Sequence, residues 1–193
     1  PMAGASLLWL FGDAAGLGLF RQAGVIGMLQ STVLIFLGPN VSRGLMFPLF
    51  YMVFLVPFGE ELVPILQTVT AEMCMLFLDL WGIPATIDGI FITTPGGYFK
   101  VAEACAGVKF LIAMVALGAL VSNLSFKNSD RRVAFMFVSI IVPILANGVR
   151  AFSTIVIAQN GNIEFAASFD HVIYGWVFFA VVIALVMGIG WRF

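Results

Sequence analysis

Three residues of this sequence have side chains that together could cleave or transfer an acyl group: Cys105, Arg150 and His171. A thiolate is the working nucleophile of cysteine, and a nearby cation lowers the pKa of the thiol. An arginine can stabilise the oxyanion that forms during attack on a carbonyl, and a histidine can pass a proton to the leaving group. Asp170 precedes the histidine and could orient its ring or cap a helix. Glu103, two residues before Cys105, could pair with a cation or favour a helix N-terminus.

The spacing of these three residues places them at one depth if their helices cross a membrane. Each lies 18 to 22 residues from a basic residue at the other end of its segment: Lys127 for Cys105, Arg132 for Arg150 and Arg192 for His171. At about 1.5 Å per helical residue, these separations are roughly 27–33 Å, or one hydrocarbon thickness. We therefore predict that the three side chains cluster, roughly 3–6 Å apart, at the end opposite the basic residues.

Each residue also has a purely structural interpretation. Free cysteine is often a buried small hydrophobe, and we interpret Cys74, which lies in an apolar run, in this way. His171 could cap a helix at the membrane interface, and Arg150 could extend its charge to the lipid headgroups. The shared depth of the three residues favours a functional cluster without requiring one.

The composition indicates the class of protein that must position these residues. Of 193 residues, 62% are hydrophobic and only 10% are charged, and the mean hydropathy is +1.10. A soluble core of this size cannot bury so much apolar surface. The net charge of −1 gives no indication of nucleic-acid binding.

The few histidines and cysteines exclude several kinds of site. A single histidine excludes an HExxH zinc protease and every multi-histidine metal centre. Two cysteines are too few for a disulfide framework or a four-cysteine zinc site. The sequence also has no phosphate-binding glycine loop, so we predict neither a metal nor a cofactor.

Hydropathy predicts an all-α polytopic membrane protein with about six transmembrane helices, an interfacial amphipathic helix and a small extracytoplasmic β-hairpin. The strongest predicted spans are 102–122, 133–158 and 172–191, and Pro143 should kink the second. Weaker candidates lie at 7–20, 25–37 and 45–58. Segment 60–83 carries several acidic residues among leucines, which is typical of an interfacial helix. Turn residues within segment 85–101 predict the hairpin.

Basic residues predict the orientation of the chain. The loop 127–132 holds three of the nine basic residues, so the positive-inside rule places it in the cytoplasm. Arg43 and Arg192 fall on the same side if segment 60–83 does not cross, whereas Arg21 falls outside. No linker divides the chain, so we expect residues 1–193 to form one domain. Because the sequence opens inside an apolar stretch, we expect this domain to be N-terminally truncated.

Three motifs of the sequence resemble those of the exosortase family, most closely the exosortase A type, which is related to the archaeosortases. Glu103-Ala104-Cys105-Ala106-Gly107-Val108 resembles the cysteine motif of that family. Asn147-Gly148-Val149-Arg150 is similar to its arginine motif, and Asp170-His171-Val172-Ile173-Tyr174-Gly175-Trp176 resembles its histidine motif. Val56-Pro57-Phe58-Gly59-Glu60 and Pro95-Gly96-Gly97 fit the same subgroup, so the resemblance covers about residues 40–193. Ala106 stands where the family usually has serine, and Lys109 where it often has arginine, which leaves a hydrogen bond and a charge contact in question.

The resemblance implies a function. Exosortases are multi-pass enzymes of the bacterial inner membrane, associated with exopolysaccharide production, whose active site faces the periplasm. They process exported proteins that carry a C-terminal PEP-CTERM sorting signal, by a thiol-protease or transpeptidase reaction. The resemblance makes Cys105 the nucleophile, Arg150 the oxyanion stabiliser and His171 the acid/base, with Glu103, Asn147 and Asp170 as supporting residues.

Two other functions are compatible with the sequence. One is a membrane transferase that uses Cys105 to acylate a lipid or glycan acceptor. The other is a non-enzymatic membrane scaffold, in which Cys105, Arg150 and His171 would be individually dispensable. The sequence does not identify the individual substrate, the acceptor or the oligomeric state.

Overall fold

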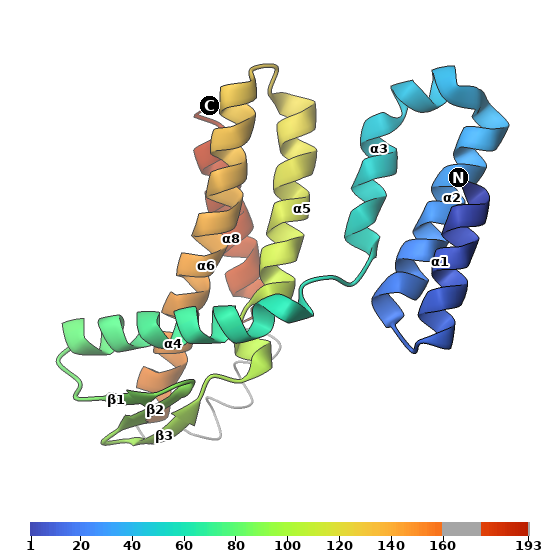
Figure 1. Cartoon of the computed structure of the whole chain (residues 1–193). Coiled ribbons are helices and arrows are strands. Elements are labelled where there is room, and N and C mark those ends of the chain that lie inside the picture. The colour runs from blue at the N-terminus through green and yellow to red at the C-terminus, as the bar shows by residue number, and fades with distance from the viewer. Residues whose placement is uncertain (160–174, 193) are drawn as a thin grey trace. The chain divides into compact units, whose positions relative to one another are not determined.

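The computed structural model describes residues 1–159 and 175–192, which are almost entirely helical apart from one small sheet. The chain forms two compact units, residues 1–60 and 61–193. Figure 1 labels their helices and strands. The predicted helical membrane protein is confirmed.

The first unit is built from two long helices and a short third one. α1 (Met2–Ala14) packs against α2 (Gly18–Gly44), and α3 (Met46–Tyr51) continues into a short 3₁₀ helix, η1 (Met52–Leu55). Segment 7–20, predicted as a weak span or the end of one, is not one continuous helix, because the chain turns between α1 and α2 within it. The predicted end of the next span at Gly38 is a kink inside α2, where Gly38 has φ 74° and ψ 167° before Pro39.

The second unit combines a helical bundle with a transverse helix and a sheet. A 3₁₀ turn, η2 (Glu60–Leu62), leads into α4 (Val63–Leu80), and the strands β1 (Thr86–Asp88), β2 (Phe91–Thr94) and β3 (Gly97–Lys100) follow. A second 3₁₀ turn, η3 (Glu103–Cys105), precedes α5 (Val108–Ser125). The bundle is completed by α6 (Ser129–Gln159) and α8 (Gly175–Gly190).

Among the described residues, four helices are long and apolar enough to cross a membrane. They cover Gly18–Gly44, Glu60–Leu80, Glu103–Ser125 and Ser129–Gln159, and two shorter apolar helices cover Met46–Leu55 and Gly175–Gly190. The predicted number of six spans is therefore not reproduced by length and hydropathy. Figure 1 shows α4 crossing α6 near the ends of α5 and α8, rather than running alongside them. This orientation favours an interfacial position for α4, because its neighbours are the helices suited to cross the bilayer.

The sheet has three strands rather than the two of the predicted hairpin. The order is β1-β2-β3 with antiparallel pairing throughout, and Ile92 of β2 lies opposite Ile87 of β1 and Phe99 of β3. Ile92 is fully buried in a cluster with Ala71, Cys74 and Leu78 of α4. α4 therefore covers the face of the sheet that carries Ile92.

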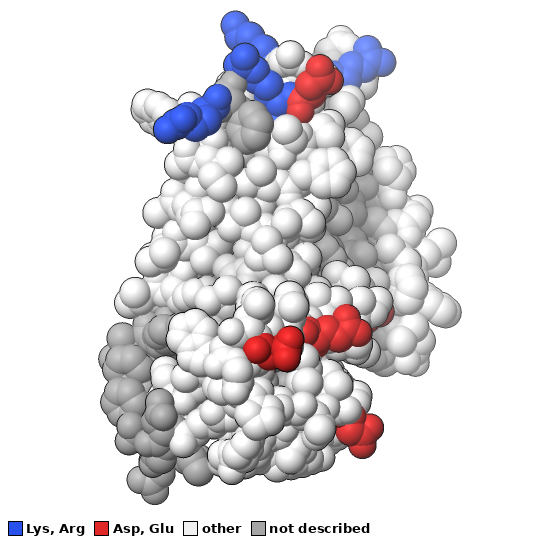
Figure 2. Space-filling view, turned by 90° about the vertical axis from the view of Figure 1, so that its left-hand side faces the viewer, with Lys and Arg blue, Asp and Glu red and all other residues white. Residues whose placement is uncertain are grey.

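Charged residues mark the two ends of the bundle. On the face seen in Figure 2, Lys and Arg gather at one end and most Asp and Glu lie toward the other, with a broad band free of both between them. An uncharged band between charged ends is the pattern expected of a membrane-embedded surface. The cluster around Met114, Phe135, Val182 and Val186 fills the interior of the bundle between α5, α6 and α8.

Candidate active site

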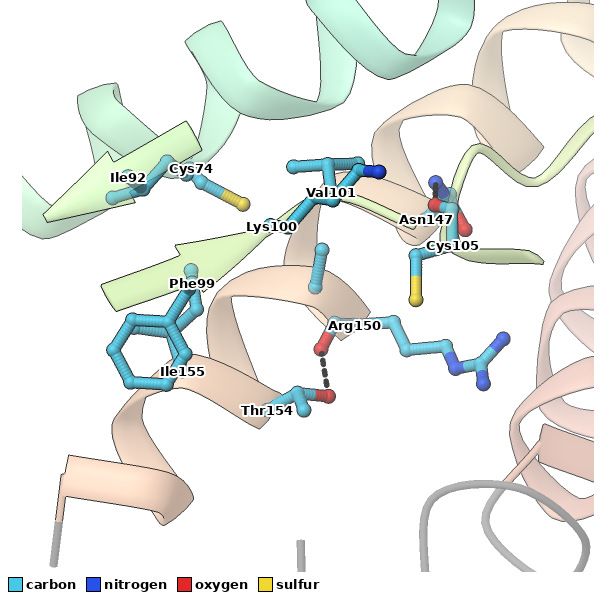
Figure 3. Close-up of a pocket in the computed structure, with 11 residues that line it drawn as sticks. Cys74, Ile92, Phe99, Lys100, Val101, Cys105, Asn147, Arg150, Thr154 and Ile155 are labelled. Atoms are coloured by element: carbon cyan, nitrogen blue, oxygen red, sulfur yellow. Dashed lines mark hydrogen bonds between the residues drawn. The ribbon is translucent and has the colours of Figure 1, made fainter. Parts of the chain in front are cut away.

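A cavity of about 100 Å³ lies where the sheet, η3 and α6 meet. Cys105 and Arg150 both line it, although 45 positions separate them in the sequence. Figure 3 shows the sulfur of Cys105 directed toward the side chain of Arg150, which extends beneath it. The remaining lining is mainly apolar: Cys74, Ile92, Phe99, Val101, Ala151 and Ile155, with Lys100, Asn147 and Thr154 as polar members.

The turn that carries Cys105 is set by its local sequence. Cys105 ends η3, in which its amide donates to the carbonyl of Ala102 at 2.9 Å. Gly107 then adopts a left-handed conformation, with φ 75°, directly before α5 begins at Val108. A Cβ at this glycine would lie 2.7 Å from the side chain of Asn147. Glycine is therefore required here both for its φ angle and for the close approach of α6.

Asn147 connects the cysteine turn to two helices. Its side-chain amide donates one hydrogen bond to the carbonyl of Cys105 at 2.8 Å and another to Oγ1 of Thr70 on α4 at 3.2 Å. Asn147 is buried, so an unpaired amide would carry a desolvation penalty. The two bonds use both amide protons, which fixes the position of the Cys105 backbone relative to α4 and α6.

A second buried amide fixes the segment between the sheet and Cys105. Nε2 of Gln67 on α4 donates to the carbonyl of Val101 at 2.7 Å. Gln67 and Thr70 are three residues apart and therefore lie on one face of α4. That face also buries Leu66, Ala71, Cys74 and Leu78. The transverse helix thus positions the cysteine segment directly through Gln67 and indirectly through the bond between Thr70 and Asn147.

Arg150 lies three residues after Asn147, so both side chains leave the same face of α6. Thr154, one turn further on, donates from Oγ1 to the carbonyl of Arg150 at 3.1 Å. Arg150 also lines a second cavity, of about 320 Å³, together with Lys109 of α5 and Trp176 of α8. The guanidinium therefore has access to the space beside Cys105 and to the space between α5 and α8.

The structure brings together some of the predicted site residues and not others. Cys105, Arg150 and Asn147 line one cavity, whereas His171 and Asp170 lie outside the described residues. Glu103 is exposed, and it forms no salt bridge with any described residue. Its predicted pairing with a cation is not seen in this part of the chain. Within residues 1–159 and 175–192, no three His, Cys, Asp or Glu side chains form a group that could hold a metal ion.

Several residues of the site were not predicted from the sequence. Gln67 donates to the cysteine segment, Lys100 lines its cavity, and Thr70 accepts a hydrogen bond from Asn147. The spacing of Gln67, Thr70 and Cys74 by three and four residues, which places them on one face of a helix, was the available signal. Cys74 is fully buried, as predicted, but it also lines the Cys105 cavity.

The arrangement can support chemistry on a carbonyl group. A thiol and a guanidinium that share one small cavity offer a nucleophile and a stabiliser for the negative charge that its attack creates. The apolar lining strengthens such electrostatic interactions by excluding water. These features define a helical membrane protein in which a cysteine and an arginine share a candidate site at the end of the bundle.

The comparisons with known proteins agree with this class. The sequence model of the family Exosortase_EpsH, described as transmembrane exosortase, matches residues 1–188, and the chain belongs to this family. The family comprises membrane-embedded sorting enzymes that are generally cysteine transpeptidases. No curated protein and no solved structure matched the chain.

Proposed function

We propose that this protein is a membrane-embedded cysteine peptidase or transpeptidase that processes the C-terminal PEP-CTERM sorting signal of exported proteins. The observation that carries the proposal is the cavity shared by Cys105 and Arg150, which come from two separate family motifs. Family membership supports a sorting reaction at this site.

The proposed reaction divides one difficult step into two. His171 accepts the proton of the Cys105 thiol, and the thiolate attacks the carbonyl carbon of the scissile peptide bond. The Arg150 guanidinium stabilises the negative charge on the carbonyl oxygen. His171 then protonates the leaving amine as the C–N bond breaks, which releases the signal and leaves a thioester on Cys105. Water or an acceptor amine attacks that thioester and restores the thiolate.

Supporting residues hold these groups in position. Asn147 orients the Cys105 turn through its bond to the Cys105 carbonyl. Asp170 is proposed to orient the His171 ring. The negative charge of Glu103 is proposed to stabilise the N-terminal end of the helical turn that carries Cys105. The expected location is the bacterial inner membrane, with Cys105 on the periplasmic side, because exported substrates present their signals there.

The test is co-expression of the chain with a PEP-CTERM substrate, followed by measurement of substrate size in membranes that contain matched amounts of enzyme. The parent chain should shorten the substrate, and Cys105→Ala should not, because no covalent step remains. Cys105→Ser should also be nearly inactive, since a hydroxyl is a far weaker acid than a thiol of pKa near 8.5. Cys74→Ala is the matched control, because it removes the other thiol of the same cavity, and it should retain activity.

Each alternative function predicts a different outcome. Full processing by Cys105→Ala would contradict the nucleophile assignment. Loss of enzyme abundance without loss of turnover per molecule would favour a scaffold. Mass spectrometry of the new carboxyl end distinguishes hydrolysis from transfer to an amine, and a lipid or glycan found there in place of a peptide acceptor would favour the transferase.

A further inference from the structure

The outer strand of the sheet exposes backbone groups beside the candidate active site. The amide of Val101 donates to the carbonyl of Ile90 at 2.9 Å, in the same register that pairs Phe99 with Ile92. Antiparallel pairing alternates, so the N–H and C=O groups of Phe99 face β2, and those of Tyr98 and Lys100 face away from it. Among the described strands, β3 has one neighbour in the sheet, so this outward row is an edge of that sheet.

This edge has no backbone partner among the described residues. No hydrogen bond joins the outward groups of Tyr98 or Lys100 to another part of residues 1–159 or 175–192. Tyr98 is 67% exposed. α4 packs against β1 and β2, the two strands further from this edge. Edge strands are normally covered, bulged or blocked by proline, because unpaired backbone groups recruit another strand. An edge that is open among the described residues has backbone groups available to pair with a strand of another molecule.

The open edge leads directly to the nucleophile. Lys100 is the last residue of β3, and Cys105 follows five positions later. Gln67 holds Val101 between them through its carbonyl. Phe99, Lys100 and Val101 line the same cavity as Cys105 (Figure 3). A strand that pairs with β3 would therefore have a fixed position relative to the cavity, because rigid structure joins β3 to the Cys105 segment.

We propose that the substrate binds as an added β-strand: an extended peptide segment pairs with the backbone of Tyr98 and Lys100 along the free edge of β3. The inference rests on the proposed peptide-processing function and assigns its peptide-binding surface. Backbone pairing of this kind is independent of side-chain identity, and specificity then comes from alternate side chains. Every second residue of the bound segment faces the side of Phe99 and Val101, where the cavity of about 100 Å³ is apolar and suits a small side chain.

The test compares two variants at one position. Tyr98→Ala keeps the outward N–H, whereas Tyr98→Pro removes it and places a ring against the incoming strand. Proline is tolerated at an edge position whose N–H is not part of the ladder. The probe is a fluorescent synthetic PEP-CTERM signal peptide, and its affinity is measured with detergent-solubilised Cys105→Ala enzyme, which cannot turn it over.

We expect Tyr98→Pro to bind the probe at least about tenfold more weakly than Tyr98→Ala, since it loses one hydrogen bond and adds a clash. With Cys105 intact, the same pair should differ in KM more than in kcat. A second measurement leaves the enzyme unchanged: single N-methyl groups moved along the probe should weaken binding at every second residue, because only alternate amides face β3. This scan also applies if the proline variant does not accumulate.

The outcomes separate the two proposals. Equal binding by the two Tyr98 variants, or N-methyl effects without a two-residue period, would overturn the strand-addition model, even if the substrate is processed normally. A proline effect on oligomeric state alone would assign the edge to pairing between two copies and would also overturn it. Selective loss of binding in Tyr98→Pro without any processing by the parent chain would support strand addition and contradict the proposed reaction. Failure of the probe to bind any variant would overturn strand addition, and failure of the parent chain to shorten the substrate as well would overturn both.

Discussion

Asn147 offers the sharpest test of how the fold positions Cys105. Replacing it with alanine removes both hydrogen bonds of its amide, including the 2.8 Å bond to the Cys105 carbonyl. The bond to that carbonyl is part-buried, so its loss leaves an acceptor that water reaches poorly. A buried group left unsatisfied in this way costs about 1–3 kcal/mol. If this free energy destabilises the reactive conformation of the cysteine turn, kcat/KM should fall by about 5- to 150-fold.

Two further variants separate orientation from simple loss of packing. Asn147→Asp keeps the shape of the side chain but turns a carboxylate oxygen toward the Cys105 carbonyl, so it should lose at least as much activity as alanine. Thr70→Val removes the longer, 3.2 Å bond and leaves the bond to Cys105 in place. It should stay within about threefold of the parent, because the cysteine turn keeps its donor.

The assay is the rate of PEP-CTERM substrate shortening in membranes, normalised to enzyme amount, with the thermal unfolding midpoint measured in detergent. Asn147→Ala should lower both the rate and the midpoint, and Thr70→Val mainly the midpoint. A normal rate per folded molecule in Asn147→Ala would refute the positioning argument. A rate loss in Thr70→Val as large as that in Asn147→Ala would assign the effect to the contact between α4 and α6 instead.

Three other predictions test the remaining assignments. Arg150→Lys keeps a positive charge but loses the planar guanidinium, so processing should be impaired while enzyme abundance stays normal; a neutral effect would contradict an oxyanion role. His171→Ala should reduce turnover by about 10²–10⁴-fold through loss of proton transfer, and near-normal turnover would remove it from the mechanism. Impermeant maleimide applied to intact cells should label a cysteine placed at Tyr98 but not one placed at Ser129, because the basic loop is expected in the cytoplasm; the opposite pattern would invert the topology.

Local pattern was sufficient to find the helices of the second unit. The predicted spans 102–122, 133–158 and 172–191 correspond to α5, α6 and α8, since long apolar runs need no information beyond themselves. The prediction failed where a short turn interrupts continuous hydropathy, as between α1 and α2. It also predicted one hairpin where three strands form, because turn residues alone do not show that β2 pairs with a strand on each side.

Residue counts along the predicted helices placed Cys105 and Arg150 at one depth, and the structure puts both residues in the lining of one cavity. This works because helical rise is fixed, so residue counts translate into distance. The prediction for His171 stays open, since that residue lies outside the described part of the chain.

The sequence by itself determined the membrane class and the main helices, and it predicted a common depth for a thiol and a guanidinium. These properties depend on hydropathy and on helical rise, which act between residues close together in the chain. Only the tertiary structure decided which groups support the thiol. Asn147 reaches Cys105 across 42 positions and Thr70 across 77, and the edge of β3 is defined by which strand has no neighbour. Such contacts depend on how α4 crosses α6 and covers the sheet, and no periodicity within a single segment carries that information.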